Sequence, residues 1–332
     1  MSDRKRVVII GAGFGGMSAA KKLAGKDVDV ILIDKRNHHL FQPLLYQVAT
    51  ADLSPAEIAW PIRSMFSKSP NVSVFMGEVT GIDLPNQRVL SGEHVLEYDY
   101  LVLATGAVTS YFGNDDWASV APGLKNITEA TNIRKSLLMA FERAENSQDE
   151  DQKRRLLNFI VVGGGPTGVE MAGAIAELAK KTLSDDFRRI DPRDARIILA
   201  EGGPRLLAAF PEDLSDYTQK SLESIGVDVR VGQAVTEITA QGAKIGDEFI
   251  PSANVIWGAG VQVPDLKDWT QKPADRGGRI KVESDLSVPG HSHVFVIGDA
   301  AHVAWRDGLT VPGIAPAAKQ QGKYVGQRIL DL

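Results

Sequence analysis

The chain has 332 residues, no cysteine and a formal net charge of −5 at pH 7. This length suits about two domains, each with its own buried core. The lack of cysteine excludes disulfides, thiolate metal ligands and cysteine nucleophiles. A mildly acidic chain without a long basic run is not expected to bind nucleic acid. No run of about twenty apolar residues occurs, so the sequence predicts no membrane-spanning segment.

Residues Met1–Arg6 lead directly into the first expected strand and leave no room for the apolar segment of a signal peptide. We therefore expect a cytoplasmic protein.

The first motif is a glycine-rich turn that follows the apolar strand 7–10 and precedes the helix-forming stretch Met17–Leu23. Its pattern is G-x-G-x-x-G, made by Gly11, Ala12, Gly13, Phe14, Gly15 and Gly16. In such a turn the first glycine allows the reversal of the chain, the second lets the backbone approach a pyrophosphate and the third lets the helix pack on the strand. The next expected strand, 28–33, ends at Asp34, where a carboxylate accepts hydrogen bonds from an unphosphorylated ribose.

Between this turn and a second one, further elements are expected in chain order. A loop at Asn37–Gln47 contains His38 and His39, read as ordinary polar residues because no nearby carboxylates support a metal site. Strands are expected at Val72–Val79 and Tyr98–Ala104, with a hairpin at Leu84–Gln87 between them. A helix beginning near Thr128 is expected to end in the solvated polar stretch Glu142–Asp151.

The second glycine-rich turn follows the apolar strand 159–162 and precedes the helix-forming stretch 169–174. It is made by Gly163, Gly164, Gly165, Pro166, Thr167 and Gly168. The strand 196–200 then ends at Glu201, which predicts an unphosphorylated ribose and so NADH rather than NADPH. Arg205 lies four residues further on. An arginine side chain binds phosphate well, so a residue of this type at this position can weaken the preference for NADH over NADPH. Two turns predict two bound dinucleotides.

The remaining strands are expected near 227–231, 235–239 and 254–257, and a late strand, 294–297, ends at Gly298 and Asp299. This order predicts an α/β protein with two Rossmann-like dinucleotide-binding domains, the second inserted in the first. The expected boundaries are 1–117 and 262–332 for the first domain and 118–261 for the second.

Together, these motifs and their order resemble the two-dinucleotide flavoprotein reductases, and most specifically the type II NADH dehydrogenases, the single-subunit NADH:quinone oxidoreductases. The resemblance covers the whole chain. It also rests on Asn37–Leu45, Ala104–Gly106, Gly298–Ala301 and Ala318–Gly322. It implies a glutathione-reductase-like fold with FAD in the first turn and NADH in the second.

The resemblance also implies site residues. FAD is expected on the first turn together with Asp34, Lys35, Arg36, Val79, Ala104, Thr105, Gly106, Asp299 and Ala315. NADH is expected on the second turn together with Glu201, Ala259 and Gly260. Catalytic roles are implied for Glu170, where nicotinamide and flavin meet, and for Gln320 and Gln321 beside the quinone; no metal is expected.

From the residues alone, Glu170 can also be a helix N-terminal carboxylate, and the paired glutamines can be solvent-exposed. The family motif commonly has glutamine where this chain has Pro316, so the role of that glutamine does not transfer.

The absence of cysteine separates this chain from disulfide reductases and sulfide:quinone reductases of the same architecture, which pass electrons through cysteines. Electrons are therefore expected to pass directly to an external acceptor, and the resemblance implies NADH and a quinone as the partners. Two alternatives stay open: a soluble NAD(P)H-dependent reductase of ferredoxin, rubredoxin or dye-like acceptors, and a flavin-binding redox sensor.

Family members continue beyond the position of Leu332 into amphipathic helices that attach to the membrane, and we expect this sequence to lack that region. A protein that carries it is expected peripherally on the inner face of the cell membrane. The resemblance leaves open whether two copies pair as a homodimer.

Overall fold

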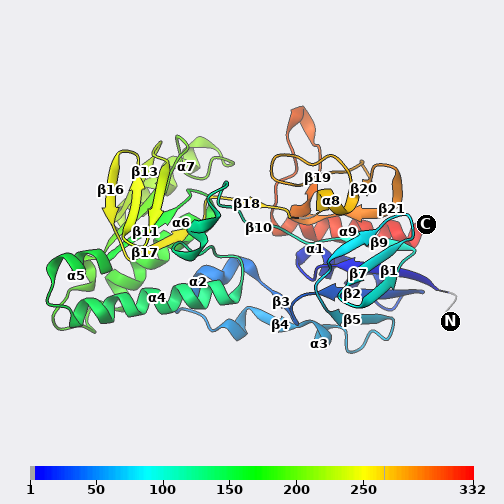
Figure 1. Ribbon diagram of the computed structural model, residues 1–332, viewed down its shortest axis with the longest axis horizontal. Coiled ribbons are helices and arrows are strands. Elements are labelled where there is room, and N and C mark those ends of the chain that lie inside the picture. Colours follow the sequence, from blue (N-terminus) through cyan, green and yellow to red (C-terminus); the bar gives the residue numbers. More distant parts are fainter. Residues whose placement is uncertain (1–3, 265) are drawn as a thin grey trace. The chain divides into compact units, whose positions relative to one another are not determined.

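The computed structural model describes residues 4–264 and 266–332, which form two compact units (Figure 1). Unit 1 comprises the residues up to Leu40 together with Ala59–Val108 and Val261–Leu332, and unit 2 comprises Phe41–Ile58 and Thr109–Gly260. The strands β10 (Val108–Thr109) and β18 (Val261–Gln262) lie where the chain leaves and re-enters unit 1.

A six-stranded sheet with the order β20-β21-β9-β1-β2-β5 organises unit 1. Its strands are parallel except for the antiparallel pair β20 and β21. Residues 7–9 are completely buried, as expected for a parallel strand covered on both faces. The bounds are β1 (Lys5–Ile10), β2 (Val28–Asp34), β5 (Val72–Met76), β9 (Tyr100–Leu103), β20 (Ser287–Val288) and β21 (His291–Val296).

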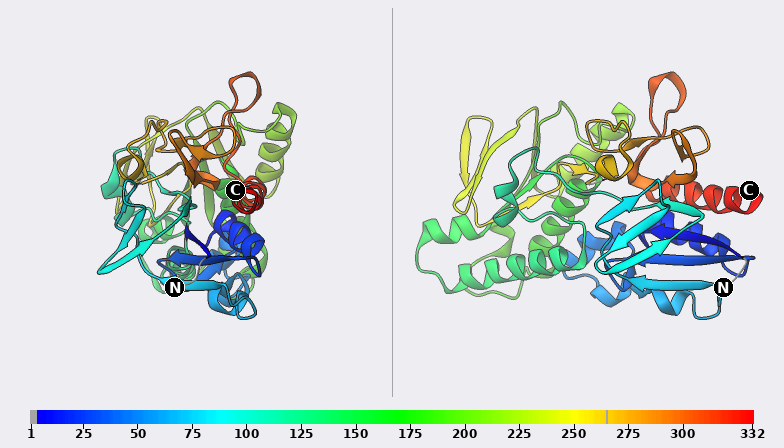
Figure 2. Two further views of the ribbon diagram at one scale, coloured as in Figure 1. Left: turned by 90° about the vertical axis from the view of Figure 1, so that its right-hand side faces the viewer. Right: turned by 45° about the vertical axis from the view of Figure 1, so that its right-hand side comes forward.

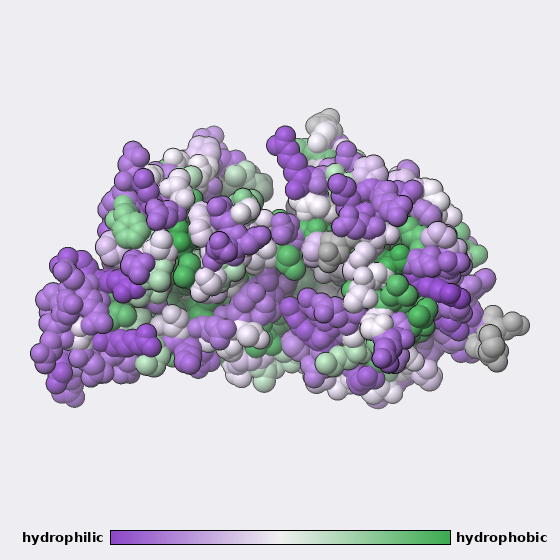
Figure 3. Space-filling model, in the orientation of Figure 1, coloured by the Kyte–Doolittle hydropathy of each residue, from purple (hydrophilic) through white to green (hydrophobic). Residues whose placement is uncertain are grey.

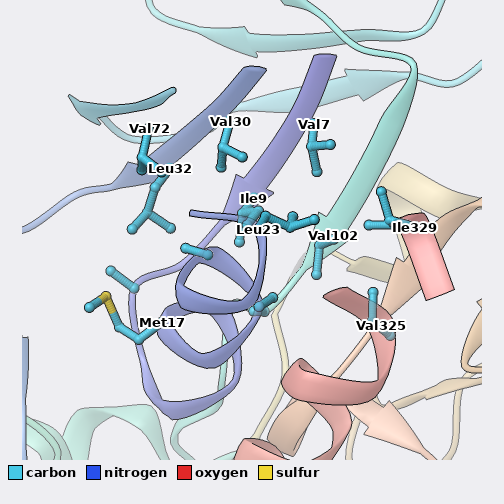
Figure 4. Packing of buried hydrophobic residues seen from close by; sticks show 14 of the residues in the cluster. Val7, Ile9, Met17, Leu23, Val30, Leu32, Val72, Val102, Val325 and Ile329 are labelled. Atoms are coloured by element: carbon cyan, nitrogen blue, oxygen red, sulfur yellow. The ribbon is translucent and has the colours of Figure 1, made fainter. Parts of the chain in front are cut away.

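Helices α1 (Phe14–Leu23) and α9 (Ala315–Asp331) pack against each other and against this sheet. Figure 4 shows Ile9 and Val102 of the sheet beside Leu23 of α1, with Val325 and Ile329 of α9 facing the same cluster. The two helices lie side by side in both views of Figure 2. The helix that begins at the first glycine-rich turn is thus held by a helix that begins 301 residues later in the sequence, Phe14 to Ala315.

Smaller elements complete unit 1. The hairpin expected at Leu84–Gln87 is confirmed, because β6 and β7 are antiparallel on either side of it. The strand expected at Val72–Val79 is shorter, since the N–H of Thr80 already bonds to the carbonyl of Leu90 in β7. These elements are β3 (His38–Leu40), β4 (Ala59–Pro61), α3 (Ile62–Met65), β6 (Gly81–Asp83), β7 (Arg88–Ser91), β8 (His94–Glu97), α8 (Leu266–Thr270), β19 (Ile280–Lys281), η6 (Gly298–Ala300), β22 (Ala301–His302) and η7 (Arg306–Gly308).

Unit 2 contains a four-stranded parallel sheet with the order β13-β12-β11-β17 and a three-stranded antiparallel sheet, β14-β15-β16. The strands expected near 227–231, 235–239 and 254–257 are confirmed. The bounds are β11 (Asn158–Val162), β12 (Arg196–Glu201), β13 (Val227–Val231), β14 (Val235–Thr239), β15 (Gly242–Ile245), β16 (Glu248–Pro251) and β17 (Asn254–Trp257).

The helices of unit 2 are α2 (Leu45–Ala49), α4 (Ile127–Asn146), α5 (Glu150–Leu156), α6 (Pro166–Glu177) and α7 (Glu212–Ser224). Short helical turns are η1 (Gln42–Leu44), η2 (Pro55–Glu57), η3 (Asp115–Ser119), η4 (Leu178–Thr182) and η5 (Pro192–Asp194).

Two expectations in these segments need correction. Asn37–Gln47 is not one loop: it holds β3, η1 and the start of α2, which packs on α4 and α6. The stretch Glu142–Asp151 is not only the end of a helix. The carboxylate of Asp149 accepts from the N–H groups of Asp151 and Gln152 at 2.9 and 3.2 Å and begins α5. Figure 3 shows hydrophilic residues over α5, as expected for a solvated surface.

Candidate functional site: two dinucleotide-type turns

The three glycines of the first turn have different surroundings. Gly11 adopts φ +100° and leaves no room for a side chain, because a Cβ there would overlap the carbonyl of Ala104. A Cβ on Gly16 would overlap the carbonyl oxygen of Gly11. Gly13, by contrast, has an ordinary φ of −72° and no atom within 4 Å of a Cβ position. The middle glycine therefore presents open backbone at the start of α1.

The second turn repeats this arrangement. Gly163 has φ +107° and lies against Ala259, and a Cβ on Gly168 would overlap the carbonyl oxygen of Gly163. Gly165 has φ −76° and open space at its Cβ position. Pro166 and Thr167 begin α6, where proline is tolerated because the first N–H groups of a helix have no partner within it.

Each turn is bound by the acid that ends the next strand. Asp34 accepts from the N–H of Ala12 at 2.7 Å and from that of Arg36 at 2.8 Å. Glu201 accepts in the same way from Gly164 at 2.5 Å and from Gly203 at 2.6 Å. An ionised carboxylate has about four acceptor positions, so each acid keeps capacity for the hydroxyls of a ribose.

A loop after a third strand approaches each first glycine. In unit 1 this loop follows β9 and contains Ala104, Thr105 and Gly106, which has φ +70°. In unit 2 the loop after β17 contains Ala259 and Gly260 beside Gly163. Both loops thus lie next to the first glycine of their turn, and the cofactor contacts expected of their residues stay predictions.

The Gly298–Asp299 turn follows β21 in unit 1. Gly298 has φ +70°, and its N–H donates to the side-chain oxygen of Gln321 in α9 at 2.6 Å. A Cβ on Gly313 would lie 3.1 Å from Oδ1 of Asp299, so the segment before α9 passes close to this carboxylate. Ala315 is the first residue of α9, and Gln320 is exposed on the same helix.

His39 is a contact that sequence reasoning missed. Its ring is buried and its Nδ1 lies 2.7 Å from the carbonyl oxygen of Ala12 in the first turn. The ring also meets Phe14 edge-on at 5.4 Å, and Nζ of Lys319 lies 4.9 Å from the centre of the Phe14 ring. Because a carbonyl only accepts, Nδ1 carries the proton. Burial lowers the pKa of His39, which favours this neutral form. The available signal in the sequence was the apolar residue Leu40 directly after His39, which is compatible with a short, partly buried strand.

The first turn of α6 contains no acidic residue, and Glu170 lies beyond that turn. The helix dipole acts mainly within the first turn, so it explains this carboxylate poorly. The side chain is exposed, yet surrounding atoms remove enough water to raise its pKa. Burial and the charge of Glu170 both raise the pKa of Tyr46 in α2, which places the two side chains within electrostatic range.

The other expected residues lie at the edges of these sites. Val79 is half-buried against the core of unit 1, and Nζ of Lys35 lies 3.8 Å from a carboxylate oxygen of Glu78. The guanidinium of Arg205 donates to the carbonyls of Phe210 and Ala208 and to the hydroxyl of Ser215. Arg205 is therefore engaged in holding its own loop, which favours the unphosphorylated ribose predicted from Glu201.

The expected FAD residues all lie in unit 1, and the expected NADH residues, with Glu170, all lie in unit 2. Both sets fit a dinucleotide for the same two reasons. The open middle glycine at the start of a helix leaves room for a pyrophosphate, and the carboxylate at the end of the next strand has spare acceptor positions for a ribose. A parallel sheet, two such turns and a Gly-Asp turn define a protein that binds two dinucleotides.

Comparison with known proteins agrees with this geometry. Residues 5–322 match the family described as pyridine nucleotide-disulphide oxidoreductase. The chain belongs to this family and, within it, to the branch of the type II NADH:quinone oxidoreductases.

Relatives in that branch include two proteins of Mycobacterium tuberculosis. The type II NADH:quinone oxidoreductase Ndh is 47% identical over 98% of this chain and 72% of its own length, and NdhA is 45% identical over 98% and 71%. The type II NADH:quinone oxidoreductase of Staphylococcus haemolyticus is 29% identical over 99% of this chain and 83% of its own length.

Solved structures share the fold. NDH2 from Plasmodium falciparum in complex with NADH has a TM-score of 0.91 at 21% identity, covering 99% of this chain and 84% of that one. The sulfide:quinone oxidoreductase of Aquifex aeolicus has a TM-score of 0.81 at 19% identity, covering 98% and 76%.

Proposed function

We propose that this protein oxidises NADH and reduces a quinone with a bound FAD. The observation that carries the proposal is the duplicated turn, in which an open middle glycine and an acid at the end of the next strand recur in both units. We assign the first turn to FAD and the second to NADH, as the resemblance to the type II NADH dehydrogenases implies.

Bound FAD supplies the redox chemistry, because it takes a hydride from NADH and returns electrons to an acceptor. The chain itself binds and orients. The N–H groups at the start of α1 and α6 would hold the two pyrophosphates, while Asp34 and Glu201, which already accept from the N–H groups of Ala12 and Gly164, would accept from the ribose hydroxyls. These contacts position donor and acceptor, which lowers the entropic part of the barrier.

The cysteine count favours an external electron acceptor, and the names of the relatives point to a quinone. Disulphide reductases of this family use a redox-active cysteine pair, and this sequence contains no cysteine. Electrons must therefore leave for an external molecule. Glu170 and Gln320 are exposed polar residues on α6 and α9, and we assign them to proton supply and acceptor binding.

The test follows each half of the reaction in anaerobic stopped-flow experiments with the holoprotein. We expect NADH to bleach the flavin absorbance within one turnover time, and a short-chain quinone to restore it. A flavin that NADH reduces only slowly would indicate a redox sensor. Rapid reduction by NADH with reoxidation by ferredoxin but not by quinones would indicate a soluble reductase.

The quinone partner also bears on location. In the part of the chain that the structure describes, no helix has the length and apolar character to cross a bilayer. We propose that a protein carrying the amphipathic C-terminal region of the family lies peripherally on the inner face of the cell membrane, where long-tailed quinones dissolve. Co-flotation of such a protein with quinone-loaded liposomes tests this, and its complete recovery away from the lipid would contradict it.

A further inference from the structure

Gln320 and Gln321 are neighbours on α9, yet they have different surroundings. Gln320 is exposed to solvent, whereas Gln321 is half-buried. The side-chain oxygen of Gln321 lies 2.6 Å from the backbone nitrogen of Gly298, which donates its hydrogen to it. One glutamine thus faces outward, and the other is bonded to the Gly298–Asp299 turn.

The N–H of Gly298 needs this side chain because the sheet no longer supplies an acceptor. The preceding residue, Ile297, still donates to the carbonyl of Leu103 in β9 at 3.0 Å. Gly298 then turns away from the sheet with φ +70°. An N–H without an acceptor at a partly buried position is costly, so the bond to Gln321 fixes where the chain leaves β21. The next residue is Asp299.

The other end of this bond is also anchored. Gly322, adjacent to Gln321, packs so closely on α1 that a Cβ would overlap the carbonyl oxygen of Gly15. Val325 and Ile329 are almost completely buried against the sheet and α1 (Figure 4). The amide of Gln321 therefore joins the Gly298–Asp299 turn to a helix that is held against the first glycine-rich turn.

We propose that Gln321 is a positioning residue of the flavin site, which holds the Gly298–Asp299 turn, and that Gln320 alone of the pair is available to the electron acceptor. This assignment rests on the proposed function, in which FAD occupies unit 1. It changes the role that the sequence pattern implied, since both glutamines were expected beside the quinone.

The test compares four variants of the holoprotein by their release of FAD. Gln321→Met keeps the length of the side chain but removes the acceptor, whereas Gln321→Glu keeps an oxygen that can accept from Gly298. Gln320→Leu tests the exposed neighbour. Gln327→Leu is a matched control, because it removes an amide that bonds to Asp331 at the surface of the same helix.

We measure the FAD dissociation constant by diluting each holoprotein and following the fluorescence of released flavin, together with the unfolding temperature. We expect Gln321→Met to bind FAD about tenfold more weakly, in line with the loss of one partly buried hydrogen bond. The Gln321→Glu, Gln320→Leu and Gln327→Leu variants should retain FAD as the parent does.

Parent-like FAD affinity in Gln321→Met would overturn the assignment, and so would an equal loss in Gln327→Leu, which would point to a general effect on α9. If Gln321→Met does not fold, the FAD affinity of Gln321→Glu provides the test. This variant keeps an acceptor for the N–H of Gly298, so weaker FAD binding by it would contradict the proposal. Failure of the parent protein itself to bind FAD would instead refute the proposed function.

Discussion

At the scale of single residues, the glycines of each turn divide into two kinds. Gly16 and Gly168 leave no room for a methyl group, because the carbonyl oxygen of the first glycine of the same turn occupies that space. Gly13 and Gly165 have room for a side chain and an ordinary φ. The first kind is required for folding, whereas the second is required only for a ligand that approaches the backbone.

Gly13→Val is therefore expected to abolish FAD retention while the protein stays folded. The valine side chain fills the space through which the pyrophosphate reaches the N–H groups at the start of α1. The flavin absorbance of the purified variant measures FAD retention, and its circular dichroism shows whether it is folded. Gly16→Ala is the control and should lower the stability by about 1–3 kcal/mol, since the added methyl group overpacks the turn. A yellow, folded Gly13→Val protein would contradict the assignment of this turn.

Glu201 is expected to set the preference for NADH over NADPH. Its carboxylate bonds to the N–H groups of Gly164 and Gly203 and repels a 2′-phosphate, while Arg205 is occupied by its own loop. Glu201→Ala should narrow the ratio of kcat/KM values for the two donors about tenfold, because a hydrogen bond to a charged group is lost for NADH alone. Equal kcat/KM values in the parent protein would show that another cation offsets the carboxylate.

At the scale of elements, unit 1 is closed by contacts between segments far apart in the chain. Asp275 is an example near β19 and β22. Its carboxylate accepts from Nε of Arg279 at 2.7 Å and lies 3.0 Å from Nδ1 of His302, and it also accepts from the N–H of Gly277 at 2.9 Å. Burial acts to raise the pKa of Asp275, but these bonds outweigh it and the pKa is lowered.

Asp275→Asn should therefore destabilise the protein at neutral pH, and the difference from the parent should shrink in acid. A carboxyl with a lowered pKa in the folded state contributes its stability above the pKa of the unfolded chain, about 3.9. That contribution is lost as the pH falls from there through the lower folded pKa. Urea unfolding of both proteins at neutral pH and below about pH 4 gives the measurement. If the difference in unfolding free energy between the two proteins stays constant or grows as the pH falls, the stabilising role of the Asp275 carboxylate is refuted.

At the scale of the whole molecule, each unit contains a complete turn, an acid and a covering loop. The two ligand sites are therefore expected to be separable by mutation. Gly165→Val should keep full flavin content but lose reduction of the flavin by NADH, because its side chain enters the open space of the second turn only. Reduction by dithionite and reoxidation by a short-chain quinone should persist. Rapid bleaching of this variant by NADH at low concentration would place the NADH site elsewhere.

Local sequence determined much of this protein. Strands of continuous apolar residues, such as 7–10 and 159–162, must be buried on both faces, and glycines spaced G-x-G-x-x-G after them permit one kind of turn. The α/β class, the two turns, Asp34 and Glu201 follow from these short-range rules, because each depends on residues close together in the chain.

Only the tertiary structure decided which distant residues complete the sites. The bond from Gly298 to Gln321 spans 23 positions, and that from the ring of His39 to the carbonyl of Ala12 spans 27. No local pattern specifies them, since they depend on how α9 and β3 pack against the first turn. Sequence reasoning therefore found the glycines and acids of both turns, but it could not distinguish Gln320 from Gln321, because only the packing of α9 buries one and exposes the other.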